Sequence, residues 1–296
     1  MRILVTGAAG NLGSVTVKYL IENGYEVRAT DLAMKHELSC PLDLSDLTDY
    51  AACVRLVEGM DAVVHLGNIP NARMAPPPIG YRTNMSCNFN IFQAALEAGV
   101  ERVLFASSIQ VYGMEADGEL RDNAVPPHFP MDRETPVCPQ NWYALSKLAG
   151  ENALEYYAGQ HGLDSVAFRF PMLVHWDMKP AGRVERKAYH NVWRFLTMME
   201  AARLLEHCLR ADLPGFRAYF PVYPGTVLGW TPQDVIREFF PDTPLRKPLE
   251  KIETLVDISH ITRETGWAPT VPMLEASPMV IPQCKPKPTE EKKSAA

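Results

Sequence analysis

Three glycines near the N-terminus, Gly7, Gly10 and Gly13, restrict the fold of this chain more than any other feature. They follow an apolar run, Ile3 to Val5, that is typical of a buried parallel strand, and they precede a segment with the apolar spacing of a helix. At such a turn the missing side chains let the backbone approach a pyrophosphate, and the free amides of the helix stabilise its charge. The pattern therefore predicts a dinucleotide-binding unit.

Asp31 ends the next apolar run, which begins at residue 25. It lies 24 residues after Gly7, close to the spacing of about 20 at which such folds place the carboxylate that accepts hydrogen bonds from the adenosine ribose. Its charge would repel a 2′-phosphate, so we predict NAD rather than NADP, with Lys35 as the residue that opposes this preference. The alternative interpretation of Asp31 is a helix cap or a turn former.

The composition excludes several classes of partner. With 296 residues, 47% of them hydrophobic, the chain can bury a large core as one extended domain or as a domain with a smaller lobe. A net charge of −6 gives no reason to expect nucleic acid or an anionic membrane. We find no secretory leader pattern and no long apolar stretch, and we predict a cytoplasmic protein. Cysteines and histidines lack metal-ligand spacing, so no metal site is expected.

Strand and helix patterns alternate through the first half of the chain, which predicts βαβ units, a parallel sheet and a doubly wound α/β fold. One helical segment is Asn88 to Ala98. The expected strands are 2–5, 25–30, 61–66, 102–107 and 164–170. Two proline-rich segments, 69–78 and 113–139, are expected to line the site as loops at strand ends.

After about residue 172 the alternation loosens and prolines gather, with single helices expected at Trp193 to Leu209 and Pro232 to Phe239. We therefore predict a dinucleotide-binding domain over residues 1–172 and a small substrate lobe over 173–281, interleaved with it. The Lys-, Pro- and Glu-rich residues 282–296 are predicted to be disordered.

Tyr143 and Lys147 are the main candidates for chemistry, because side chains four residues apart share one face of a helix. An ammonium group next to a tyrosine favours the phenolate, which can take the proton of a substrate hydroxyl as hydride leaves. Ser108 follows the strand 102–107 at its carboxyl end, where it could orient the reacting oxygen. The alternative for Ser108 is an ordinary Ser-rich transition from strand to loop.

These motifs together resemble the extended short-chain dehydrogenases/reductases, the NAD-dependent epimerase/dehydratase group. The matching segments cover residues 1–270 in order: TGAAGNLG at 6–13, Asp31, Asp43 with Leu44, HLGN at 65–68, the Asn84 to Ala95 pattern, SSIQVYG at 107–113, YALSK at 143–147 and GWAP at 266–269. The resemblance implies a Rossmann-type fold, with Ser108, Tyr143 and Lys147 as the catalytic trio and Lys147 also holding the nicotinamide ribose.

The resemblance also implies which residues meet the cofactor. Asp43 and Leu44 would contact the adenine, and Phe170 and Pro171 would lie near the carboxamide. For Asp43, Asn84 and His65 the alternatives are a cap, a turn former and a satisfied core group. The full set expected to bind NAD is Gly7, Gly10, Asn11, Leu12, Gly13, Asp31, Asp43, Leu44, Leu66, Gly67, Asn68, Asn84, Ser107, Tyr143, Lys147, Phe170 and Pro171. The set expected near the substrate is Asn68, Ser108, Gln110, Met172 and Arg183.

Departures from the family pattern narrow the predicted reaction. Ile109 stands where dehydratases carry an acid, so sugar dehydration is not expected. Met172 stands where nucleotide-sugar members commonly have Asn, and the chain after Lys147 is short for a full nucleotide-sugar lobe. The shape more nearly resembles that of uronate dehydrogenases.

A basic cluster lies within residues 175–191: Lys179, Arg183, Arg186 and Lys187. It is either a clamp for a carboxylate or phosphate, or a solvated loop.

The leading hypothesis is an NAD-dependent oxidation of a sugar or sugar acid hydroxyl. The alternatives are a sugar epimerase that keeps its NAD, and a non-catalytic redox sensor that binds the dinucleotide. By resemblance, we expect a homodimer formed through the helix that carries Tyr143 and its neighbour.

Overall fold

A computed structural model describes residues 1–34, 38–116, 119–120, 125–174, 193–225 and 230–270. Its centre is a seven-stranded sheet in the order β11-β8-β5-β4-β1-β2-β3, and every neighbouring pair is parallel. The strands are β1 (Arg2–Thr6), β2 (Glu26–Asp31), β3 (Leu42–Leu44), β4 (Ala62–His65), β5 (Arg102–Ser108), β8 (Asp164–Phe170) and β11 (Phe216–Tyr219). The doubly wound α/β fold is confirmed. Its topological switch point lies between β1 and β4, where such sheets bind ligands at the strands' carboxyl ends.

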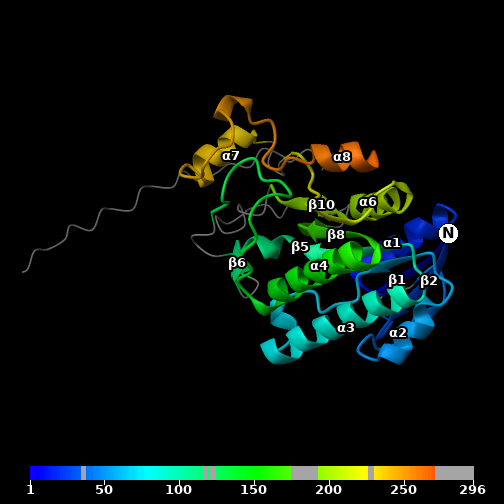
Figure 1. Cartoon of the computed structure of the whole chain (residues 1–296). Helices are drawn as coiled ribbons and strands as arrows, with labels where there is room; N and C mark the ends of the chain where they lie inside the picture. The colour runs from blue at the N-terminus through cyan, green and yellow to red at the C-terminus, as the bar shows by residue number, and fades with distance from the viewer. Residues whose placement is uncertain (35–37, 117–118, 121–124, 175–192, 226–229, 271–296) are drawn as a thin grey trace, which may run out of the picture.

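Helices cover both faces of the sheet (Figure 1). One face carries α1 (Asn11–Glu22) and α6 (Met198–Arg210), which pack against each other. The other face carries α2 (Tyr50–Val57), α3 (Pro77–Glu97) and α4 (Trp142–His161), with α3 between the other two.

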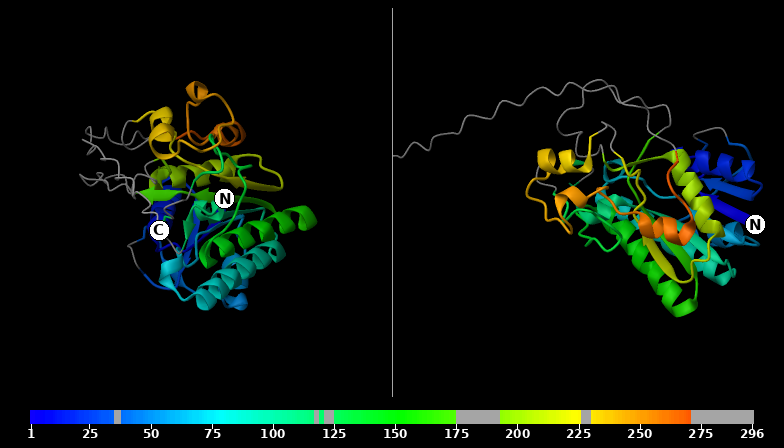
Figure 2. Two further views of the ribbon diagram at one scale, coloured as in Figure 1. Left: turned by 90° about the vertical axis from the view of Figure 1, so that its left-hand side faces the viewer. Right: turned by 90° about the horizontal axis from the view of Figure 1, so that it is seen from above.

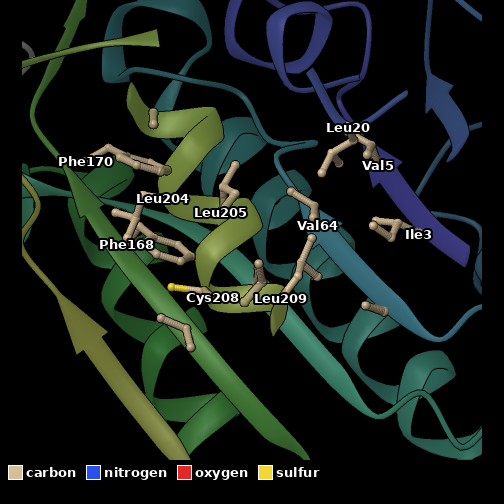
Figure 3. Packing of buried hydrophobic residues seen from close by; sticks show 14 of the residues in the cluster. Ile3, Val5, Leu20, Val64, Phe168, Phe170, Leu204, Leu205, Cys208 and Leu209 are labelled. Carbon is tan, nitrogen blue, oxygen red and sulfur yellow. The ribbon is translucent and has the colours of Figure 1, made fainter. Parts of the chain in front are cut away.

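The alternation of side chains along each strand produces two separate cores. Ile3 and Val5 point to the layer of α1 and α6, and Leu4 between them points to the layer of α2, α3 and α4. Figure 3 shows the first of these cores, in which Leu204 and Leu205 of α6 pack over the strands. Because both faces are covered, the central strands β1, β4 and β5 each carry a run of buried apolar residues, as expected for a parallel sheet.

A third core belongs to a smaller lobe, and its residues come from separate parts of the chain, including Phe129, Trp193, Phe220 and Phe240. The elements that supply this core are the short helices η2 (Ile109–Tyr112), α7 (Pro232–Phe239) and η3 (Leu249–Lys251). The parallel pair β9 (Met172–Val174) and β10 (Phe195–Thr197) and the helix α8 (Ser259–Thr265) contact α6 and add apolar residues to the first core. Figures 1 and 2 show α7 and α8 in yellow and orange, on the side of the molecule away from α2 and α3. The remaining short elements are η1 (Ala72–Met74) and the antiparallel pair β6 (Glu115–Ala116) and β7 (Glu119–Leu120).

Several expected boundaries are wrong. The segments of β3 and β11 extend the two edges of the sheet and were not expected as strands. The predicted helix Trp193 to Leu209 begins as strand β10, and α6 starts only after Thr197, whose hydroxyl caps it by accepting from the Glu200 amide at 3.1 Å.

Two expected loops also contain more order than predicted. The segment 69–78 includes the start of α3, because Pro77 suits the first helical position, where no intrahelical amide bond is needed. The later part of the segment 113–139 joins the lobe core, with Phe129 and Met131 bridging to Leu245 and Val256. The division of the chain into domains stays a prediction, and residues 282–296 lie outside the described residues.

Within the described ranges, no helix is both long and apolar enough to cross a membrane.

A glycine in α4 tests how closely that helix packs on the sheet. A Cβ at Gly150 would lie 2.7 Å from Cε1 of Phe105 on β5, whereas a Cβ at Gly159 of the same helix would meet nothing within 4 Å. We expect Gly150→Ala to lower the free energy of unfolding in urea by about 1–3 kcal/mol through overpacking. The matched control Gly159→Ala should raise it by about 0.5–1 kcal/mol because alanine favours the helix. Equal effects of the two changes would contradict the packing.

Candidate active site

Two positions at the turn between β1 and α1 have room only for glycine. Gly7 has a φ of +65°, and a Cβ there would lie 2.7 Å from the carbonyl carbon of Leu66. A Cβ at Gly13 would lie 2.1 Å from the Gly7 carbonyl oxygen. Gly10 is the N-cap of α1, so no side chain satisfies the first amides of that helix. The turn is thus a bare backbone cradle at the switch point of the sheet, which fits a pyrophosphate.

Asp31 ends β2 beside this cradle. Its carboxylate accepts hydrogen bonds from the amides of Ala9 at 3.0 Å and Leu32 at 2.7 Å, so it is fixed next to the glycine turn. Asp43 and Leu44 lie on β3 at the same sheet edge, with Leu44 in register with Asp31. Leu44 is 66% exposed. The edge therefore presents a carboxylate and an open apolar side chain beside the cradle, as the ribose and adenine of a dinucleotide require.

Lys147 lies almost fully buried between α4 and the sheet, only 3% exposed. Its ammonium donates to Oδ1 of Asn68 at 2.6 Å and to the carbonyl of Ala106 at 2.7 Å. It also lies 5.5 Å from the centroid of the Tyr143 ring. Burial lowers the pKa of Lys147 to about 7. Tyrosine and lysine are thus neighbours, as the four-residue spacing predicts.

Ser108 is linked to the first turn of α4 by hydrogen bonds through Gln110 and Asn141. It ends β5, and its hydroxyl accepts from the Gln110 amide at 3.2 Å. The side chain of Gln110 accepts from Asn141 at 3.0 Å, and Asn141 caps the first turn of α4, where Tyr143 lies. Ser108 and Tyr143 are each 7% exposed. The structure therefore joins the end of β5 to the start of α4.

Two predicted cofactor residues make internal contacts. The amide of Asn84 is buried and bonds both backbone groups of Ile69 and the Ser146 hydroxyl. The hydroxyl of Ser107 donates to Glu151 at 2.5 Å. These contacts give both side chains partners within the protein, and the cofactor roles of both residues stay predictions.

The other predicted residues lie around the cradle or at its mouth. Asn11 and Leu12 open α1, and Leu66, Gly67 and Asn68 follow β4 directly. Phe170 ends β8 and is buried, whereas Met172 at the start of β9 is 46% exposed. Pro171 lies between them. Arg183, with Lys179, Arg186 and Lys187, lies outside the described residues, as does Lys35.

A buried ion pair beneath the site was missed by the sequence analysis. Arg169 of β8 donates to both carboxylate oxygens of Glu151, at 2.9 Å for the shortest contact, and also to the Tyr112 hydroxyl at 3.2 Å. Burial raises the pKa of Tyr112 to about 12. Glu151 lies one turn after Lys147 on the same face of α4, and this spacing is the one local feature of the sequence that could have indicated a buried role for Glu151. The pair ties α4 and β8 to Ser107, the neighbour of Ser108.

In the residues that the structure places, no group of three or more His, Cys, Asp or Glu side chains could hold a metal ion.

A glycine cradle at the switch point, a carboxylate beside it and a buried lysine next to a tyrosine define a dinucleotide-dependent enzyme of the Rossmann type. The NAD dependent epimerase/dehydratase family model matches residues 3–200. The chain belongs to this family, and its cofactor is NAD.

Individual relatives carry several activities. The chain is 30% identical over 239 residues to a uronate dehydrogenase of Pseudomonas syringae pv. tomato, covering 77% of each protein. It is 34% identical over 178 residues to an L-arabinose 1-dehydrogenase (NAD(P)(+)) of Haloferax volcanii, covering 58% of this chain and 67% of that one. A crystal structure of a UDP-galactose 4-epimerase superposes with a TM-score of 0.65 at 25% identity, covering 93% of this chain and 96% of the other.

The lowered pKa of Lys147 makes stability depend on pH. Between its folded pKa of about 7 and its ordinary value of 10.5, the unfolded chain binds the proton and the folded chain does not, so the folded state gains stability as pH rises. Relative to Lys147→Met, we expect the wild-type free energy of unfolding to rise across this window by at most about 1.4 kcal/mol per pH unit. Chemical denaturation at pH 6, 7.5 and 9 measures this. A difference that stays constant with pH would contradict a lysine pKa near 7.

Proposed function

We propose that this protein oxidises a hydroxyl group of a sugar or a sugar acid, with NAD⁺ as the oxidant. The observation that carries the proposal is the buried Lys147 ammonium at the carboxyl edge of the sheet, which lies next to Tyr143 and donates to Asn68 in the segment after β4. The uronate and L-arabinose dehydrogenases support the same reaction class.

In this proposal each member of the trio has one task. Tyr143 takes the proton of the substrate hydroxyl, and Ser108 orients that oxygen by hydrogen bonding. Lys147 stabilises the phenolate of Tyr143 by its charge, so the two groups titrate as a coupled pair. NAD⁺, when bound, accepts the hydride that leaves the substrate carbon as the carbonyl forms.

The cradle and the adjoining sheet edge would hold the cofactor. Gly7, Gly10 and Gly13 would contact the pyrophosphate through the backbone, and Asp31 would accept from the adenosine ribose. Asp43 and Leu44 would border the adenine. The carboxylate of Asp31 disfavours a 2′-phosphate at this position, which supports NAD over NADP.

The small lobe favours a compact substrate. Met172 on β9 offers no amide at the mouth of the site, and the lobe is built from short helices. A free uronate or aldose fits this better than a nucleotide sugar, and the uronate dehydrogenase relative favours the acid.

Epimerisation is the second candidate, and the superposition with a UDP-galactose 4-epimerase over nearly the whole chain supports it. An epimerase uses the same trio but returns the hydride to the substrate. Net formation of NADH separates the two functions.

The proposed oxidation is tested with purified protein, NAD⁺ and a panel of uronates, aldoses and nucleotide sugars, with NADH followed by its absorbance. We expect NADH to accumulate with a uronate, and Tyr143→Phe to lower kcat by about 10²–10⁴-fold because the base is lost. The control Tyr50→Phe removes only an exposed hydroxyl on α2 that donates to Glu97, so it should leave kcat unchanged. An isomerised sugar without NADH would favour the epimerase.

A homodimer through α3 and α4 is part of the proposal. Large apolar side chains are exposed on both helices, Ile79 and Phe89 on α3 and Leu145 and Tyr156 on α4, each about half exposed (47–57%). The two helices pack side by side (Figure 1). By contrast, Leu154 and Tyr157 of α4 are buried in the core of the same subunit.

The mass in solution tests this interface. Because a charge buried without a partner opposes association, Phe89→Asp combined with Tyr156→Asp should convert a dimer to a monomer in light scattering after size exclusion. The control Val54→Asp alters an exposed apolar residue on α2 and should leave the mass unchanged. A wild-type monomer would refute the proposed dimer.

A further inference from the structure

A continuous chain of hydrogen bonds begins at Lys147 and ends at Thr6, directly before the glycine cradle. The ammonium donates to Oδ1 of Asn68 at 2.6 Å. The Asn68 amide nitrogen donates to Oδ1 of Asn88 at 2.9 Å, and that oxygen is also 3.0 Å from Nε2 of His65. Nδ1 of His65 is 2.7 Å from the hydroxyl of Thr6. Four side chains, from β1, β4, the segment after β4 and α3, are thus linked by hydrogen bonds to the amine of Lys147.

The donor and the acceptor of each of these hydrogen bonds can be assigned by starting at Thr6. The Thr6 hydroxyl already accepts from the amides of Leu66 at 3.2 Å and Gly67 at 3.1 Å, so its single proton is donated to Nδ1 of His65. Full burial lowers the pKa of His65 to about 3, so the ring is neutral and carries its proton on Nε2.

The neutral histidine then fixes the two asparagines. Nε2 of His65 donates to Asn88, so the atom of Asn88 that faces the chain must be its oxygen. An oxygen there accepts a second bond from the amide nitrogen of Asn68. The other end of the Asn68 amide is therefore its oxygen, and it faces Lys147. A flipped Asn68 would place two donors against each other at Lys147 and two acceptors against each other at Asn88.

We propose that Asn68 is a positioning residue that keeps the Lys147 amine protonated and aimed past the Tyr143 ring, and that Asn88, His65 and Thr6 hold its amide in the required orientation. A hydrogen bond from an ammonium to a carbonyl oxygen favours the charged form of the lysine. This hydrogen bond therefore counteracts the effect of burial, which lowers the pKa of Lys147. The proposal rests on the proposed function only for the statement that a protonated Lys147 serves catalysis.

None of the ionisable groups described around Lys147 stabilises its ammonium by a negative charge, so neutral oxygens stabilise it. Tyr143 lies on its own helix, His65 on β4 is neutral, and Cys87 faces it from α3 as a thiol whose pKa burial raises to about 12. β5 contributes the Phe105 ring and the Ala106 carbonyl. Glu151, one turn further along α4, is paired with Arg169 of β8. Among the side chains that the structure describes, that of Asn68 accepts a hydrogen bond from the amine.

The test is the titration of Lys147 in the cofactor-free protein, followed by NMR of ¹³Cε-labelled lysine and assigned with Lys147→Arg. Asn68→Ala removes the acceptor and should lower the pKa of Lys147 by about one pH unit, the equivalent of one charge-assisted hydrogen bond. Asn68→Asp keeps an oxygen and adds a negative charge, so the pKa should rise above that of the wild type. A purely structural role for Asn68 cannot produce shifts of opposite sign.

Asn90→Ala is the matched control, since Asn90 lies on the same helix as Asn88 but its amide bonds the carbonyls of Leu47 and Thr48. It should leave the Lys147 titration unchanged. If Asn68→Ala fails to fold, the rise in Asn68→Asp alone decides the matter. A wild-type titration in both Asn68 variants, or shifts of the same sign, would overturn the proposal.

An activity measurement separates this inference from the proposed function. Because a fall of one pH unit in the pKa lowers the protonated fraction tenfold above that pKa, kcat/KM for the uronate should fall about tenfold in Asn68→Ala. Its alkaline limb should move to lower pH by the same amount. Opposite NMR shifts without any uronate oxidation would sustain the role of Asn68 and refute the dehydrogenase. Uronate oxidation with unchanged NMR titrations would support the dehydrogenase and refute the role of Asn68.

Discussion

Burial of charged groups at the carboxyl edge of the sheet is the constraint on which the rest of this structure depends. An isolated charge buried in protein costs several kcal/mol unless hydrogen bonds or an opposite charge compensate it. Lys147, Glu151 and Arg169 all lie in this region, each less than a tenth exposed. Oxygens of Asn68 and Ala106 compensate the first, and the other two compensate each other. These bonds determine where α4 sits against β5 and β8.

Helix α4 presents polar side chains to the sheet at every fourth residue. Tyr143, Lys147 and Glu151 lie on one face and are all buried against the sheet. Gly150 lets this face approach Phe105, which also brings the amine close to the ring. A helix held further from the sheet would leave the lysine in water, where its charge would act weakly on the tyrosine. Close packing is therefore part of the chemistry proposed for this site.

The sequence was sufficient for those features that are encoded locally. Gly7 and Gly13 could be placed because a turn with no room for a Cβ requires glycine, and Tyr143 and Lys147 because helical spacing places them together. The short edge strands β3 and β11 were missed, since three or four residues carry little periodicity. Glu151 with Arg169, and Asn68 with Asn88, are contacts between distant segments, and no local pattern indicates which partner a buried polar residue will find.

One hydroxyl joins two parts of the molecule that are usually considered separately. Thr6 binds the backbone that supports the glycine turn and, through His65, orients the amides behind the reactive amine. A substitution that moves the backbone of Leu66 and Gly67 would therefore also alter the hydrogen bonds that orient Asn68. Evolution toward new substrates has more freedom in the short helices of the lobe, which are not connected to this hydroxyl by the bonds described above.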